Sequence, residues 1–133
     1  MPRTSTVVAS AAFVGAGTMH FVRPDFFEAI VPDWVPDAQL ANRLSGAAEI
    51  ALGLGLLVPS TRRISALGLV GVLAAVFPAN VDMALNDVEV TPGDDGRMER
   101  SVGTAPGPGR VVNWVRLPLQ VPMVWAMLRE ARR

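Results

Sequence analysis

Apolar residues gather in four long runs that are separated by polar segments. The runs cover about residues 5–22, 40–58, 64–85 and 111–128. Each is close to the roughly 20 residues that a helix needs to cross the hydrocarbon core of a bilayer. The chain has 12 basic and 12 acidic side chains, of which only four lie inside the runs: Arg43, Glu49, Asp82 and Arg116. This segregation predicts an all-α polytopic membrane protein, with four antiparallel transmembrane helices in an up-down-up-down bundle.

The polar segments between the runs differ in character. Residues 23–39 interleave aromatic and acidic side chains, which is typical of a short segment lying at the lipid headgroups. Residues 86–110 are rich in Gly and Pro and show no apolar period, so they predict a mobile, solvent-exposed polar loop. With only a short turn between the second and third runs, we expect a single membrane domain over residues 1–133.

The first run admits a second interpretation, because Arg3 followed by an apolar stretch also fits a cleaved signal peptide. The run continues through His20 to Val22 without a clear cleavage site of small residues, so we interpret it as a retained helix. Arginines crowd the N-terminus, the turn at 59–63 and the C-terminus. The positive-inside rule then predicts that both termini are cytoplasmic.

Composition excludes several kinds of chemistry. The chain has no Cys, which excludes disulfides, thiol redox motifs, c-type haem attachment and iron–sulfur ligation. His20 is the only histidine, so no metal site and no covalently bound cofactor is predicted within one chain. A net charge of zero and the absence of a basic run argue against nucleic acid as a partner.

Polar residues inside the predicted spans lie at one depth. An ionised side chain in a transmembrane helix costs about 2.5–3.5 kcal/mol, so each needs a reason. Counting about 1.5 Å per residue from the helix ends places the following in the outer half of the membrane: His20, Glu49, Asn80, Arg116 and Gln120. Asp82 is expected to cap the outer end of its helix.

Glu49 and Arg116 are the natural partners in this layer, because pairing offsets both charges. Glu49 shares its helix face with small residues such as Gly46 and Gly53, which predicts that the face packs inside the bundle. Two hypotheses follow. The pair is a structural clamp that fixes helix register, or the layer lines a cavity that binds a polar-headed lipophile or passes protons. A small transporter is less favoured, because the inner halves offer no polar path.

Four motifs occur in order on the four runs. They are Gly17-x-x-His20-Phe21, Ser45-Gly46-x-x-Glu49, Phe77-Pro78-Ala79-Asn80 and Arg116-x-Pro118-x-Gln120. Together they resemble the DoxX and DoxX-like family of small four-helix membrane proteins of bacteria. The resemblance covers nearly the whole chain except residues 86–110, and it implies a location in the bacterial plasma membrane.

The resemblance implies the membrane subunit of a quinone-linked redox complex, not a complete enzyme by itself. In that hypothesis Glu49 and Arg116 are catalytic, while His20, Asn80 and Gln120 bind the quinone. A partner protein, or further copies of this chain, would complete the complex, because a chain without Cys cannot run thiol chemistry. The alternative is a non-catalytic anchor or assembly subunit for a partner protein, with a purely structural ion pair.

Overall fold

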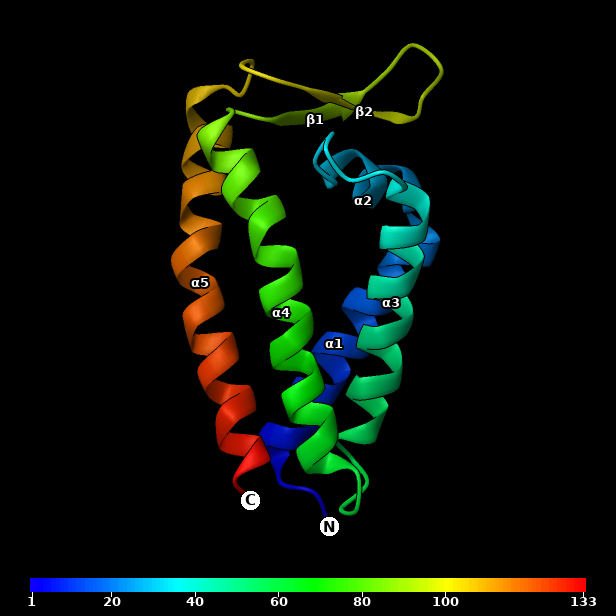
Figure 1. Cartoon of the computed structure of the whole chain (residues 1–133), viewed down its shortest axis with the longest axis vertical. Helices are drawn as coiled ribbons and strands as arrows, with labels where there is room; N and C mark the ends of the chain where they lie inside the picture. The colour runs from blue at the N-terminus through cyan, green and yellow to red at the C-terminus, as the bar shows by residue number, and fades with distance from the viewer.

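The structure, a computed structural model, describes residues 1–133 and is mostly helical, as predicted. Four long helices form the body of the molecule (Figure 1), and a short helix and a two-stranded sheet close one end. The elements in chain order are α1 (Thr4–Val22), α2 (Pro24–Ile30), α3 (Ala38–Gly55), α4 (Arg62–Leu85), β1 (Glu89–Pro92), β2 (Met98–Ser101) and α5 (Gly107–Ala131).

The helix boundaries follow from local chemistry. Pro24 stands at the first position of α2 and Asp25 in its first turn, where a missing N–H costs nothing and a negative charge suits the helix dipole. Asp37 caps α3 by accepting a hydrogen bond from the backbone N–H of Leu40 at 2.9 Å. The polar segment 23–39 therefore becomes a short helix and a capped entry into α3.

The long helices associate as two pairs. α1 packs along α3, and α4 packs along α5, with a smaller contact between α3 and α4. Both termini lie at one end of the bundle, here called the terminal end, while α2 and the strands occupy the other, here called the hairpin end (Figure 1). Two of these helices, α1 and α4, are long and apolar enough to cross a membrane.

The α1–α3 pair approaches closely because glycines face each other. A Cβ added at Gly17 would lie 2.7 Å from the carbonyl oxygen of Gly46, and one added at Gly46 would lie 2.6 Å from the Cβ of His20. The small-residue face of α3 does pack inside the bundle, against α1. This contact fixes the helix that carries His20 against the helix that carries Glu49.

The terminal end holds the largest cluster of buried apolar side chains, with Leu56, Leu69 and Met127 almost fully enclosed. Beside it, Glu130 on α5 is 5% exposed and accepts a hydrogen bond from the Thr6 hydroxyl at 2.8 Å. Arg133 pairs with the same carboxylate. These contacts join the first turn of α1 to the last turn of α5.

The segment 86–110, predicted to be a mobile loop, instead contains a β-hairpin over residues 89–101, and its last four residues begin α5. β1 and β2 pair antiparallel, with Glu89 opposite Ser101 and Pro92 opposite Met98. Gly96 sits in the connecting turn with φ of +79°, a conformation that glycine adopts without strain. Each strand is only four residues long, so composition shows no strand pattern and predicts disorder. The hairpin is held instead by contacts of its residues with α2 and α4.

Candidate ligand cavity

A cavity of about 270 Å³ lies at the hairpin end between α1, α3 and α4. The α2 helix and the residues that follow it, up to Val35, form its roof. Most of its lining is apolar. Its polar side chains are those of His20, Asn42, Ser45, Glu49 and Asn80.

His20 is held from two directions. The Asn42 side chain donates from Nδ2 to the His20 carbonyl oxygen at 3.0 Å, and its Oδ1 lies 2.7 Å from His20 Nδ1. The imidazole also stacks on Phe27, with 4.0 Å between ring centroids. Because Asn42 turns its oxygen toward Nδ1, that nitrogen must carry a proton and donate it. Nε2 is then the ring nitrogen that remains free for other partners.

Glu49 lies next to that free nitrogen. Its Oε2 is 3.7 Å from His20 Nε2, which is longer than a hydrogen bond. The same Oε2 is buried and has no hydrogen-bond partner. Burial of an unpartnered carboxylate oxygen is costly, and this oxygen faces a cavity large enough to admit a small polar group.

Asn80 stands on α4 and lines the same cavity. Its amide makes no side-chain hydrogen bond within the protein, so both its donor and its acceptor remain available. The structure therefore brings together three residues of the predicted polar layer, His20, Glu49 and Asn80. The fixed imidazole, the carboxylate and the amide share one cavity.

The other two predicted site residues lie elsewhere. Arg116 contacts the Met83 sulfur at 3.4 Å and lines a separate pocket under the hairpin. Gln120 donates from Nε2 to the Leu73 carbonyl at 3.5 Å and borders an apolar groove between α4 and α5. The predicted ion pair between Glu49 and Arg116 is wrong. Depth along the helix was a poor guide here because α5 packs on α4, away from the cavity.

Asp82 does more than the sequence predicts. As expected of a group at the end of α4, it accepts a hydrogen bond from the Asn86 amide at 2.9 Å. It also forms an ion pair with Arg100 of β2. Arg100 in turn donates to the Ile30 carbonyl at 3.3 Å and lies 3.6 Å from Asp33.

Arg100 thus ties the hairpin to α4 and to the cavity roof. This role of Arg100 was not predicted from the sequence, because Arg100 lies in a segment expected to be mobile. Asn42 and Phe27, the two residues that hold His20, were also not predicted as site residues. One signal in the sequence could have identified Asn42, because it lies on the same helix face as Glu49, near the start of that helix.

The structure has no group of three or more His, Cys, Asp or Glu side chains that could hold a metal ion.

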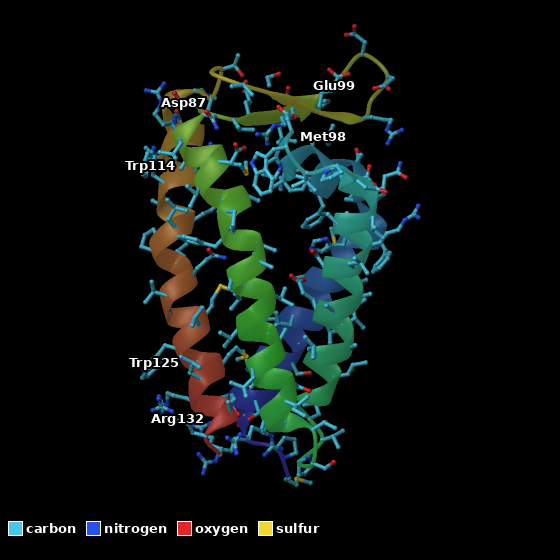
Figure 2. All side chains as sticks on the ribbon, viewed as in Figure 1. Asp87, Met98, Glu99, Trp114, Trp125 and Arg132 are labelled. Carbon is cyan, nitrogen blue, oxygen red and sulfur yellow. The ribbon has the colours of Figure 1, made fainter.

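The three tryptophans differ in their place relative to the cavity. Trp34 is part of its lining. Trp114 and Trp125 lie exposed on the outer side of α5, well away from it (Figure 2).

Comparison with known proteins defines the family. The chain belongs to the family described as Domain of unknown function (DUF8561), whose model matches residues 9–130. No curated protein matches the chain, and no solved structure matches it. The resemblance to the DoxX family stays a prediction.

Proposed function

We propose that this protein spans the membrane four times and binds a quinone, or a lipophile with a similar polar head, in the cavity at the hairpin end. The observation that carries the proposal is the unpartnered Oε2 of Glu49, buried beside a fixed imidazole in that cavity. The surrounding apolar walls suit a hydrophobic ring. In this proposal, the membrane subunit of a quinone-linked redox complex remains the best candidate function.

Exposed apolar side chains support the four-span arrangement. They occur on all four long helices, including Leu44 and Leu54 on α3, and Leu119 and Val121 on α5. Only 22 of 133 residues are buried, which suits a protein whose surface is covered by lipid. At about 1.5 Å per residue, the 18 residues of α3 and the 25 of α5 reach about 27 and 38 Å, against a hydrocarbon core of about 30 Å.

The proposed orientation places the terminal end in the cytoplasm of a bacterial cell. Arg62, Arg63, Arg129 and Arg132 lie at that end, in short segments beside the spans where the positive-inside rule applies. The hairpin end, with α2 at the headgroups, then faces the outside. The cavity lies in the outer leaflet, within reach of a lipophile that diffuses in the membrane.

The residues present fit a quinone. Asn80 can donate a hydrogen bond to one carbonyl oxygen, while Glu49 and His20 face the same space. Phe27 and Trp34 add aromatic surface to the lining. A bound quinone would supply two-electron, two-proton redox chemistry, with electrons from a partner protein.

The chain's own contribution would be to hold a proton. With Nδ1 committed to Asn42, one proton can reside either on His20 Nε2 or on Glu49 Oε2. A carboxylic acid facing a neutral imidazole, or a carboxylate facing an imidazolium, both avoid an isolated buried charge. The pair can therefore hold this proton on either member without a net buried charge. Delivery of the proton to a bound quinone would leave the Glu49 carboxylate beside a neutral imidazole, so the pair would need a new proton before the next delivery.

The test is extraction and mass spectrometry of lipophiles that copurify with the detergent-solubilised protein. Glu49→Gln keeps the shape but removes the titrating oxygen, and Asn80→Leu removes the amide. Glu99→Gln is the matched control, because Glu99 lies on the exposed face of the hairpin (Figure 2). We expect near-stoichiometric quinone in the wild type and in Glu99→Gln, with a loss in the other two variants while all keep their helical circular dichroism.

A different pattern would support the alternative, a non-catalytic anchor with a structural polar cluster. In that case no lipophile is enriched in the wild type, and Glu49→Gln lowers stability instead of occupancy. Deletion of residues 90–99 from the hairpin would then impair partner binding more than Glu49→Gln does. That combination would contradict the proposed binding function.

A further inference from the structure

A second pocket, of about 220 Å³, lies under the hairpin between β1, α5 and the end of α4. Asn113 braces it by donating from its amide to the Met83 carbonyl at 3.2 Å and the Val88 carbonyl at 2.9 Å. The base of the hairpin is thereby fixed to α5. The pocket shares no lining residue with the cavity that contains Glu49, so the two are separate.

This pocket contains a cation without a counter-ion. Arg116 lies nine residues into α5, and its only polar contact is with the Met83 thioether at 3.4 Å, which is a weak acceptor. No carboxylate lies within 4.0 Å of its guanidinium, although four other arginines form ion pairs. Most of its five N–H donors are thus available to a ligand.

The same pocket contains an anion without a counter-ion. Glu89, the first residue of β1, lines it and is half-buried. Its carboxylate makes no ion pair, and it lies beyond 4.0 Å from Arg116. Two opposite charges that share a pocket but do not reach each other can be joined by a ligand that carries both charges.

We infer that this pocket binds the head of a zwitterionic phospholipid, with the phosphate on Arg116 and a primary ammonium on Glu89. Arginine suits phosphate because its planar N–H groups can donate two parallel hydrogen bonds. An ammonium group can donate to the carboxylate. The ligand class is thus a phosphoethanolamine headgroup.

The apolar part of the pocket fits the rest of the lipid. Phe26, Val90 and Val112 contribute to its lining, and Val111 and Val115 lie exposed on the neighbouring surface of α5. Glycerol and acyl chains could follow this surface toward the membrane interior. The inference rests on the membrane location in the proposed function, and is independent of quinone binding.

The test is native mass spectrometry of the delipidated full-length protein after adding phosphatidylethanolamine, phosphatidylglycerol or phosphatidylcholine with identical acyl chains. We expect the ethanolamine lipid to bind about tenfold tighter than the glycerol lipid, the range of one charge-assisted hydrogen bond. The choline lipid should also bind weakly, because its quaternary ammonium has no N–H to donate.

Variants separate the two charges. Glu89→Gln should abolish the preference for ethanolamine and favour the anionic glycerol lipid, a gain that misfolding cannot produce. Arg116→Gln should weaken all three lipids, with Arg116→Lys retaining part of the binding. Glu99→Gln and Arg97→Gln, on exposed positions of the same hairpin, are the matched controls and should leave the preference unchanged.

Three results would overturn the inference. The first is equal binding of the three lipids by the wild type, and the second is a preference that Glu89→Gln does not change. The third is displacement of the lipid by soluble glycerophosphoethanolamine at equal concentration, which would make the ligand a soluble molecule. Quinone retention in the same preparations reports on the other cavity, so failure of one proposal can be distinguished from failure of the other.

Discussion

The close contact between α1 and α3 makes a sharp prediction for alanine substitution at Gly17. The added Cβ would lie 2.7 Å from the Gly46 carbonyl oxygen and 2.9 Å from the Glu49 Cβ. Neither backbone nor Cβ atoms can rotate away, so the two helices must separate. By contrast, a Cβ at Gly15 on the same helix meets nothing within 4 Å.

The magnitude follows from two opposing effects. Replacing an exposed helical glycine with alanine stabilises a helix by about 0.8–1.0 kcal/mol, and both variants receive this gain. Overpacking a tight contact costs about 1–3 kcal/mol, and only Gly17→Ala incurs it. We therefore expect Gly17→Ala to be less stable than Gly15→Ala by about 1–3 kcal/mol in free energy of unfolding.

The assay is equilibrium unfolding in mixed micelles, followed by far-ultraviolet circular dichroism. Gly71→Ala on α4 is a second control, because its added Cβ also meets open space. If Gly17→Ala matched the two control variants in stability, the close α1–α3 approach would be wrong. The placement of Glu49 beside His20 would then lose its basis.

Three further predictions concern the two ends of the bundle. Arg100→Gln should leave Asp82 without its ion partner, cost about 1–3 kcal/mol, and speed amide hydrogen exchange in β1 and β2. Thr6→Val should remove the 2.8 Å hydrogen bond to buried Glu130 and cost about 1–3 kcal/mol, measured by the same unfolding assay. The hydrogen bond from the Met98 N–H holds the pKa of Asp25 below its ordinary value of 3.8. The contribution of Asp25 to hairpin docking is therefore present above pH 3.8 and lost as the pH falls through the lowered pKa. The protection of the Met98 amide against hydrogen exchange, taken relative to the intrinsic rate at each pH, should fall on that acidification in the wild type, whereas in Asp25→Asn it should be low throughout.

Much of the helical framework could be predicted from the sequence, because each long helix contains all or most of one of the long apolar runs. The predicted run 64–85 and α4 (Arg62–Leu85) differ by two residues at one end. The small-residue face carrying Gly46 and Glu49 was also expected inside the bundle, and it packs there against α1. The bounds of a helix depend largely on its own sequence, and packing through small residues is common to closely packed helices. Both can therefore be predicted without knowledge of the neighbouring helices.

The partners of individual side chains could not be predicted in the same way. Glu49 and Arg116 were expected at a similar depth, but which helix packs on which decides whether they meet. The pairing of α4 with α5 turns Arg116 toward the hairpin. The hairpin itself was missed because it depends on Arg100 and Asp25, which bind elements distant in the sequence. Such contacts leave no periodic pattern.

The most direct test of the central claim is a quinone titration followed by tryptophan fluorescence. Trp34 is exposed on one side and lines the cavity, whereas Trp114 and Trp125 lie on α5, away from it (Figure 2). In a protein with Trp114→Phe and Trp125→Phe, the remaining tryptophan is therefore the one at the cavity. We expect saturable quenching by a short-chain quinone, weakened about tenfold by Glu49→Gln and unchanged by Glu99→Gln. Quenching that never saturates, or that is identical with and without the Glu49 carboxylate, would contradict it.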